Sequence, residues 1–226
     1  MLAILRDFLK DANLKDLRLL DLGSSGGIIA HYFSNYFGKV LAIDIDRPAV
    51  ESAHRSFKND NMHCLVGDAL YLPIRDEAVD VLVCNHIYEH VADARRLITQ
   101  VYRVLKPGGI CYFAAGNRIT LREPHYQLPL LSILPKSLSH IYLRFSGKGN
   151  YYFETLLTYR ELQRLVQGFL VIDYTKRIIE SPNPFYADYM IREGSLKAKI
   201  AKLVVTYAYW LCPTYIWLLQ KPNLRS

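Results

Sequence analysis

This sequence contains few cysteines and no internal repeats. Its 226 residues include four cysteines, none at a spacing that indicates a metal or redox site, and there is no internal repeat or low-complexity tract. Cys64, Cys84 and Cys111 fall in apolar segments, where a thiol behaves as a small apolar group. Residues 1–13 read as an amphipathic helix, not as a signal peptide, because charged residues such as Arg6 and Asp7 break any apolar core. We therefore expect a cytoplasmic protein that forms a single domain over residues 1–226.

The sequence also lacks an apolar run of the length that a membrane span requires. The longest candidate, Leu203–Leu219, is shorter than the ~20 residues of a span and is broken by Pro213. We interpret it as a core helix, over 195–211, followed by a strand. Lysines precede this run, and it contains tyrosine and tryptophan, a combination that also suits a membrane interface. Peripheral membrane contact is therefore kept as a possible interaction, and the sequence does not indicate an oligomeric state.

Acidic residues are fewer than basic ones, which gives a formal net charge of +7. Such an excess suits an acidic substrate, a nucleic acid or an anionic membrane. The basic residues are scattered along the chain, and no RNA-binding appendage is visible. A large nucleic acid is therefore not expected as a partner.

One segment carries a clear chemical pattern. Leu19–Gly27 passes from an apolar run through Asp21 into a glycine-rich turn, and a helix-like segment follows. A buried strand, a tight loop and a helix start are how α/β proteins hold a nucleotide. Asp44 ends a second apolar run 21 residues after Gly23, where a carboxylate can accept hydrogen bonds from both hydroxyls of a ribose.

Two common nucleotide motifs do not fit this loop. A dinucleotide fingerprint needs glycine at its first, third and sixth positions, but counting from Gly23 the third is Ser25 and the sixth is Ile28. No Gly-Lys-Ser/Thr sequence follows, so a phosphate-binding P-loop is absent as well. A nicotinamide cofactor is disfavoured, and the remaining pattern, acid-x-Gly-x-x-x-Gly, is formed by Asp21, Gly23 and Gly27.

This pattern resembles the first motif of class I S-adenosylmethionine-dependent methyltransferases, the broad group that includes the ubiquinone and menaquinone methyltransferases. The usual form is Asp-x-Gly-x-Gly-x-Gly, from which this chain departs at Ser25. Three later blocks resemble the same family in order and spacing: Val66–Ala69, Leu72–Asp80 and Leu105–Gly109. The resemblance covers roughly residues 17–117.

The resemblance implies S-adenosyl-L-methionine as the cofactor and assigns residues to it. In relatives, the acid of the Val66–Ala69 block faces the adenine amino group. The residues expected to bind the cofactor are Asp21, Gly23, Ser24, Gly27, Asp44, Ile45, Asp68, Ala69, Asn85 and His86. Asn85, at the end of the fourth predicted strand, is also expected to line the transfer site.

Strands and helices alternate along the first half, which predicts an α/β protein with a Rossmann-like doubly wound sheet. The family implies seven mostly parallel strands, with strand seven antiparallel. The expected strands lie at 17–23, 40–46, 62–67, 79–85, 109–116, 169–179 and 215–220. The expected helices include 26–37, 48–58, 90–104 and 195–211. Residues 118–157, which contain prolines and a tyrosine-rich patch, are interpreted as a lid inserted after strand five, and a capping box at Thr158 and Glu161 restarts the fold.

Methyl transfer from a sulfonium is an in-line displacement that depends on orientation and, for a hydroxyl acceptor, on a base. His125 and Tyr126 of the insertion are the predicted acid–base residues, with Asn85 as a third catalytic candidate, because histidine can take a proton at neutral pH. The acceptor is expected to be small or lipid-linked and to be methylated at oxygen. The alternative is a non-catalytic subunit that binds the cofactor and serves a partner.

The segment His86–His90 permits several interpretations. It matches the inverted zinc-protease motif, but a predicted strand runs into His86, whereas that motif lies on one helix. Metal-assisted methyltransferases carry Glu-x-x-Glu-His at this place, where Glu89 and His90 match and His86 replaces the first Glu. Many metal-free relatives carry Glu-His-Val here, as this chain does through Val91. We favour that interpretation and predict no metal.

Overall fold

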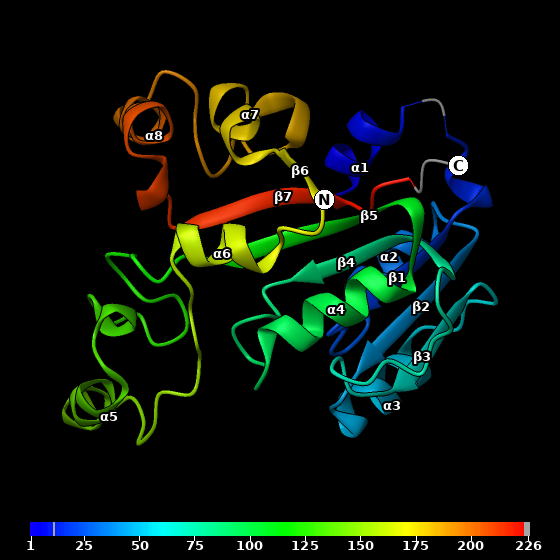
Figure 1. Cartoon of the computed structure of the whole chain (residues 1–226), viewed down its shortest axis with the longest axis horizontal. Coiled ribbons are helices and arrows are strands. Elements are labelled where there is room, and N and C mark those ends of the chain that lie inside the picture. Colours follow the sequence, from blue (N-terminus) through cyan, green and yellow to red (C-terminus); the bar gives the residue numbers. More distant parts are fainter. Residues whose placement is uncertain (11, 224–226) are drawn as a thin grey trace.

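A computed structural model describes residues 1–10 and 12–223, and a seven-stranded sheet runs through its centre (Figure 1). The strand order is β3-β2-β1-β4-β5-β7-β6. The first five strands pair in parallel, and β7 runs antiparallel between β5 and β6. The predicted α/β class, with a doubly wound sheet and a reversed seventh strand, is confirmed.

The strands are β1 (Arg18–Leu22), β2 (Lys39–Asp44), β3 (Met62–Val66), β4 (Val79–Asn85), β5 (Leu105–Gly116), β6 (Leu170–Asp173) and β7 (Thr214–Gln220). The α-helices are α1 (Leu2–Leu9), α2 (Ile28–Ser34), α3 (Arg47–Ser56), α4 (Ala94–Val104), α5 (Lys136–Phe145), α6 (Tyr159–Leu165), α7 (Thr175–Glu180) and α8 (Leu196–Tyr207). Short 3₁₀ turns are η1 (Leu14–Asp16), η2 (Leu131–Ile133), η3 (Asn183–Phe185) and η4 (Tyr209–Leu211).

Local sequence sets several of these boundaries. Asp46 caps α3 by accepting the Ala49 N–H at 3.4 Å, and Pro48 occupies the first turn, where its missing N–H costs nothing. The predicted capping box at the start of α6 is present: Thr158 and Glu161 each accept a backbone N–H of the other. These short-range signals therefore fix where α3 and α6 begin.

Alternate residues of the strands pack on opposite faces of the sheet. Leu20, Leu82 and Phe113 pack on the side of α4 and α6, whereas Leu19 and Val81 pack on the side of α1 and α2. Helices therefore cover both faces, and the central strands read as nearly continuous apolar runs because both of their faces are buried.

The point where the chain changes direction across the sheet is beside β1. From β1 the chain builds β2 and β3 on one side, and it then returns to place β4 on the other side of β1. In doubly wound sheets, ligands bind outside the carboxyl ends of the strands at such a switch point. The loops that follow β1 and β4 are therefore where a cofactor should bind.

The prediction of one strand over 169–179 is wrong in its second half. β6 ends at Asp173, and α7 follows directly. The Asp173 carboxylate accepts the Thr175 N–H at 2.8 Å, which turns the chain into the helix. Ile178 of α7 then packs into the core on the α1 side of the sheet. The apolar run continues into α7 because the helix buries its own apolar face there.

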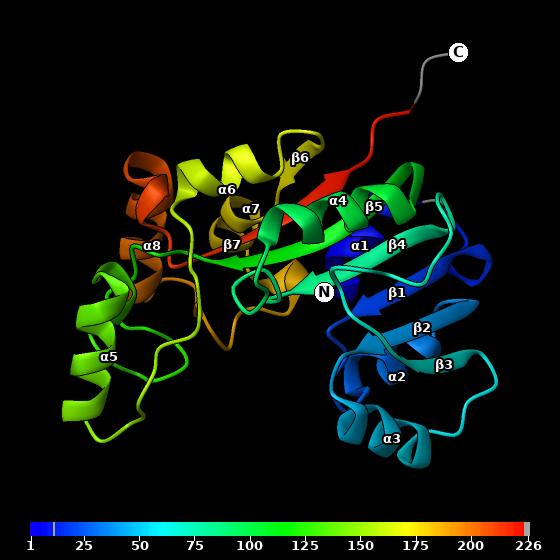
Figure 2. The ribbon, with the colours of Figure 1, turned by 60° about the horizontal axis from the view of Figure 1, so that its bottom comes forward.

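The insertion (residues 118–157) contains η2 and α5 and extends beyond the carboxyl ends of β4 and β5 (Figures 1 and 2). It has a small core of its own, formed by Leu128, Leu131, Leu143 and Tyr152. Its role as a lid stays a prediction.

Three of the four cysteines were expected to behave as small apolar side chains. All four cysteines are free thiols, and Cys84, Cys111 and Cys212 are buried. Burial raises the pKa of the Cys84 and Cys212 thiols above their usual range, in keeping with an apolar role.

Within residues 1–10 and 12–223, every helix is too short or too polar to cross a bilayer.

Candidate functional site

The glycine-rich loop after β1 turns back onto β2. The N–H groups of Gly23 and Ser24 both donate to the Ile43 carbonyl, at 2.8 and 3.1 Å. Gly23, Ser25 and Gly27 have φ values of +71°, +45° and +74°, so the loop uses the left-handed region repeatedly. Ser25 occupies the place where the family has glycine. Glycine is usual there because the backbone at this position is left-handed, a conformation that glycine adopts without steric cost.

Two glycines of the loop differ sharply in their surroundings. A Cβ atom at Gly23 would lie 2.2 Å from Ile87 Cδ1, so the β1 loop packs directly against the segment after β4. At Gly26 the φ angle is not in the left-handed region, and a Cβ atom there would meet nothing within 4 Å. Gly23 is thus required by the fold of the site, whereas Gly26 is not.

Asp44, at the end of β2, faces this loop. Its Oδ2 accepts the Ser25 N–H at 2.6 Å, and its Oδ1 accepts the Asp46 N–H at 2.9 Å. The carboxylate therefore lies beside the glycine-rich turn, and its binding of a ribose stays a prediction. A ribose held here would share Asp44 with the backbone of the loop.

Replacing Asp44 with alanine should weaken S-adenosylmethionine binding by about 1–3 kcal/mol, because a charged hydrogen-bond acceptor is lost. Calorimetric titration measures the change. The matched control is Asp46→Ala, which removes a nearby carboxylate that caps α3. Asp46→Ala should cost about 1 kcal/mol of stability without changing cofactor affinity. Equal affinities in the two variants would show that the ribose does not bind at Asp44.

The next strand end continues the same edge. The Gly67 N–H donates to the Asp44 carbonyl at 2.9 Å, which brings the end of β3 beside the end of β2. Asp68 Oδ1 accepts the Leu70 N–H at 2.8 Å and closes a turn that contains the partly buried Ala69. The Ile45 side chain is 71% exposed, so it offers an apolar surface for a flat ring.

Asp21 lies under the loop and is nearly inaccessible. Its side chain is 2% exposed, and its Oδ2 has no hydrogen-bond partner within the described structure. Burial is the main cause that raises the pKa of Asp21 to about 7. The charge of Asp44 raises this pKa further, whereas a backbone hydrogen bond from Ala30 lowers it in part. A buried carboxylate oxygen without a hydrogen-bond partner, two residues before Gly23, suits a ligand that carries an ammonium group.

Asp21 should make the free energy of unfolding pH-dependent. Its pKa is higher in the folded chain than in the unfolded chain, so ionisation favours unfolding. Stability is lost as pH rises between about 4 and 7, and roughly 2 kcal/mol of that loss falls between pH 5 and 7. The measurement is urea unfolding across this pH range without cofactor. Asp21→Asn is the control, because it cannot ionise. Parallel stability curves for the two proteins would contradict the prediction.

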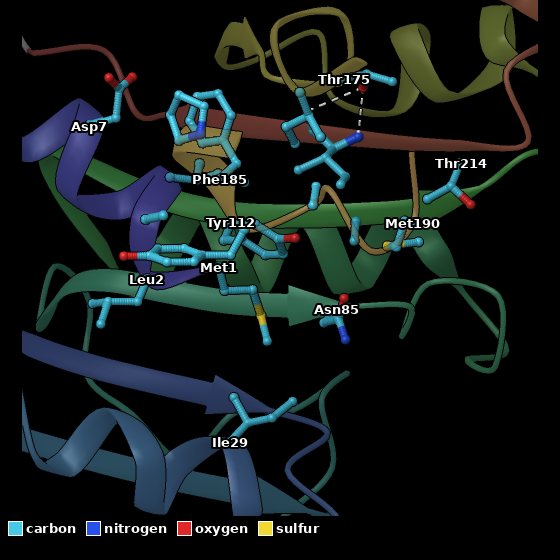
Figure 3. A pocket seen from close by; sticks show the side chains of 18 of the residues that line it. Met1, Leu2, Asp7, Ile29, Asn85, Tyr112, Thr175, Phe185, Met190 and Thr214 are labelled. Carbon is cyan, nitrogen blue, oxygen red and sulfur yellow. Dashed lines mark hydrogen bonds between the residues drawn. The ribbon is translucent and has the colours of Figure 1, made fainter. Parts of the chain in front are cut away.

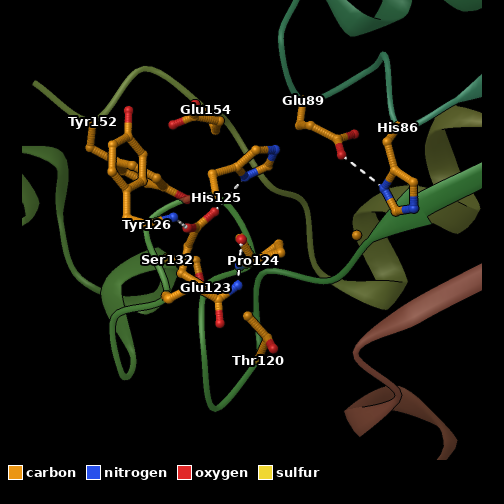
Figure 4. Close-up of polar contacts among 12 residues, drawn as sticks. His86, Glu89, Thr120, Glu123, Pro124, His125, Tyr126, Ser132, Tyr152 and Glu154 are labelled. Carbon is orange, nitrogen blue, oxygen red and sulfur yellow. Dashed lines mark hydrogen bonds and ion pairs between the residues drawn. The ribbon is translucent and has the colours of Figure 1, made fainter. Parts of the chain in front are cut away.

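His86 follows β4 in an uncommon backbone conformation. Its φ is +58°, a value that an L residue adopts only when its surroundings hold it, and its N–H donates to the Ala114 carbonyl at 2.9 Å. Glu89 Oε1 accepts a hydrogen bond from His86 Nδ1 at 3.0 Å (Figure 4). The Glu89 side chain is 1% exposed, whereas the His86 side chain is 40% exposed. A buried carboxylate therefore orients the ring and leaves Nε2 available.

A second carboxylate–imidazole pair lies in the insertion. Glu123 Oε1 accepts a hydrogen bond from His125 Nδ1 at 2.6 Å, and the Tyr126 N–H donates to Glu123 Oε2 at 2.7 Å (Figure 4). The His125 ring packs edge-to-face against His90, with ring centroids 4.9 Å apart. The predicted pair His125 and Tyr126 is thus organised by a buried acid that sequence reasoning did not single out.

The two pairs approach each other. Glu89, His90 and His125 each present one ligand atom, and these atoms lie within 4.8 Å of one another, so this set has the spacing to hold a metal ion. His86, which the sequence motif would include, is not one of the three. The prediction of no metal stays a prediction.

A large cavity lies at the carboxyl ends of β4 and β5. Its volume is about 1270 Å³. Asn85 and His86, where β4 ends, line it together with Ile29 at the start of α2. Figure 3 shows Asn85 at the tip of β4, between the side chains of Ile29 and Met190. The cavity therefore adjoins the glycine-rich loop, from which α2 begins.

The cavity walls come from segments that the sequence did not connect with the site. The lining residues belong to α1, the face of α2, β5, β7 and the stretch 175–191. Most of these side chains are apolar, and Asp7 is held by Tyr174 and Arg177 at 2.6 and 2.9 Å. Among the described residues, none of the insertion lines this cavity. Of the three predicted catalytic residues, the structure places Asn85 here and His125 and Tyr126 outside.

Residues 20–113, which contain the loops after β1 and β4, match the model of a methyltransferase domain. The matched segment is similar to the methyltransferase domains of the class I S-adenosylmethionine-dependent enzymes. The resemblance seen in the sequence is confirmed, and the cofactor of this family is S-adenosyl-L-methionine. The unsatisfied Asp21 carboxylate and the glycine loop fit that cofactor.

Individual relatives agree with this assignment. A ubiquinone biosynthesis O-methyltransferase of Sinorhizobium fredii is 28% identical over 166 residues, which are 72% of this chain and 63% of the relative. A probable S-adenosylmethionine-dependent methyltransferase of Mycolicibacterium smegmatis is 30% identical over 112 residues, 50% of this chain and 42% of the relative. The chain thus spans about half the length of these curated relatives.

The fold is shared over nearly the whole chain with solved structures. An S-adenosylmethionine-dependent methyltransferase of Mesorhizobium loti superposes with a TM-score of 0.60 at 15% identity, covering 96% of this chain and 95% of the other. At that identity the likeness concerns the fold and not the acceptor.

Proposed function

We propose that this chain transfers a methyl group from S-adenosylmethionine to an oxygen atom of an apolar, small or lipid-linked acceptor. The observation that carries the proposal is the cavity, because it is about 1270 Å³, mostly apolar, and reaches Asn85 and His86 beside the cofactor loop. Its volume exceeds that of pockets for drug-sized ligands, about 300–1,000 Å³. This size suits an acceptor with an apolar tail.

The cofactor residues follow from the family and the loop geometry. Asp21, Gly23, Ser24 and Gly27 would hold the methionine part, Asp44 and Ile45 the ribose, and Asp68 and Ala69 the adenine. When bound, the cofactor supplies a methyl group already activated by its sulfonium. The protein must then orient the acceptor and exclude water, which can supply about 7–11 kcal/mol of the barrier.

His86 is the side chain best placed to take the proton of an acceptor hydroxyl. It lines the cavity, its Nδ1 is held by Glu89 at 3.0 Å, and its Nε2 is left for the acceptor. Glu89 would act as a positioning residue, as carboxylates do for catalytic imidazoles. Sequence reasoning assigned His86 to the cofactor and weighed it as a metal ligand, but did not propose it as the base, although the His-x-x-Glu spacing was visible. His125, Tyr126 and Asn85 remain the catalytic residues predicted from sequence.

Calorimetric titration with S-adenosylmethionine and S-adenosylhomocysteine, with NADH as the control, is the first experiment. Binding of the two sulfur compounds alone supports the cofactor assignment. Quinone precursors, polyketides and glycolipids are then screened for formation of S-adenosylhomocysteine. Cofactor binding without turnover across the panel would instead favour the alternative, a subunit that binds the cofactor for a partner. The cytoplasmic location stays a prediction.

A further inference from the structure

Helix α8 is apolar on two opposite faces, only one of which is buried. Ala198 and Val205 face the protein and are almost inaccessible. On the other side Leu196, Ile200, Leu203 and Tyr207 follow one another at helical spacing and are 73%, 52%, 58% and 82% exposed. All four side chains of this second face are therefore more than half exposed.

Helix α5 repeats the arrangement in the insertion. Leu143 is buried, whereas Leu138, Ile141 and Phe145 are 50%, 43% and 88% exposed and share one face of the helix. Figures 1 and 2 both place α5 and α8 at the same end of the molecule. We call these seven side chains the apolar end: Leu138, Ile141, Phe145, Leu196, Ile200, Leu203 and Tyr207.

Helices α5 and α8 carry basic residues and no acidic ones. No acidic residue follows Glu193 in the sequence, and none lies between Glu123 and Glu154, which are both buried. Lys199 and Lys202 are exposed on α8, on the side of the helix between its buried face and its apolar stripe. In the described structure no carboxylate pairs with either lysine.

We propose that the apolar end docks on an anionic lipid bilayer. Basic residues that flank exposed apolar and aromatic side chains are typical of helices that lie in a membrane interface. Trp210, in the turn after α8, is 51% exposed, and tryptophan side chains are enriched at the membrane–water interface. A second copy of the chain is a poorer occupant, because it would bring lysines against lysines.

The acceptor cavity opens next to this end, and this part of the inference rests on the proposed function. Tyr189 and Met190 line the cavity and are 82% and 55% exposed. Lys197 of α8 donates from Nζ to the Met190 carbonyl at 2.8 Å, which ties the cavity rim to the helix. A lipid-like acceptor could therefore pass from the bilayer into the cavity without crossing water.

Vesicle binding by the full chain tests the proposal. Phosphatidylcholine vesicles are compared with vesicles that also contain phosphatidylglycerol, by co-sedimentation and by tryptophan fluorescence. The chain has two tryptophans, and Trp217 is 2% exposed, so a blue shift on binding reports Trp210. We expect binding to the anionic vesicles to be at least about tenfold stronger. Equal binding to the two, or none to either, would overturn the proposal.

Two double variants test whether vesicle binding depends on the lysines of α8 or only on the net charge of the chain. Lys199→Glu with Lys202→Glu should reduce anionic-vesicle binding about tenfold or more. Lys39→Glu with Lys58→Glu makes the same change in net charge at exposed sites outside α5 and α8, and should leave binding nearly unchanged. Equal losses in both would contradict a localised surface. Calorimetry with S-adenosylmethionine shows that the variants are folded.

Leu203→Asp tests the apolar part and the rival occupant together. It should abolish the Trp210 blue shift while the chain stays a monomer at all concentrations in light scattering. A wild-type dimer that Leu203→Asp dissociates would assign the apolar end to a second copy and refute the membrane. If wild-type protein binds vesicles but not the cofactor, the proposed function fails and the docking surface stands.

Discussion

Replacing His86 with alanine is expected to lower kcat by a factor of ~10²–10⁴, the usual contribution of a positioned general base. The expectation depends on three observations: His86 lines the cavity, Glu89 fixes its Nδ1 at 3.0 Å, and its backbone is held at a φ of +58°. The loss should be in kcat, because proton transfer occurs after the acceptor binds. Steady-state kinetics with an acceptor from the screen measures it, alongside calorimetry of cofactor binding.

His125→Ala is the matched variant, because His125 is also an imidazole held by a buried carboxylate. It lies in the insertion and does not line the cavity, so its effect on kcat should be smaller than that of His86→Ala. A larger loss in His125→Ala would place the base in the insertion, as the sequence predicted, and would imply that the insertion closes over the acceptor. Glu89→Gln should lower kcat less than His86→Ala, because it keeps a hydrogen-bond acceptor for His86.

Gly23→Ala is expected to cost about 2–5 kcal/mol in the free energy of unfolding and to abolish measurable cofactor binding. A left-handed φ of +71° costs an alanine about 1–2 kcal/mol, and the overlap with Ile87 adds about 1–3 kcal/mol unless that side chain moves. Binding should fail because moving Ile87 displaces the loop after β4, which holds His86.

Gly26→Ala is the control for this prediction, three residues along the same loop. Its φ is outside the left-handed region and no atom lies within 4 Å of the added carbon, so stability should change by no more than about 0.5 kcal/mol. Urea unfolding and calorimetric titration compare the two variants. If Gly26→Ala were as damaging as Gly23→Ala, the loop would differ from the geometry described above.

The sequence alone determined the family, the cofactor and the sheet. The glycine loop, the acids that end β2 and β3, and the apolar strands are short patterns whose meaning is set by neighbours within a few residues. Caps such as Thr158–Glu161 are equally local and were predicted correctly. The second half of 169–179 was not, because an apolar run suits a buried strand or the buried face of a helix, and the turn at Asp173 decided between them.

The tertiary structure alone decided which surfaces surround the site. The cavity joins α1 and the stretch 175–191 to the ends of β4 and β5, segments that are far apart in sequence and meet only because the sheet order brings them together. The apolar faces of α5 and α8 look like core in the sequence, and packing leaves them exposed. Burial is a property of the whole fold, so no local pattern distinguishes an apolar face that is covered from one that is left for a partner.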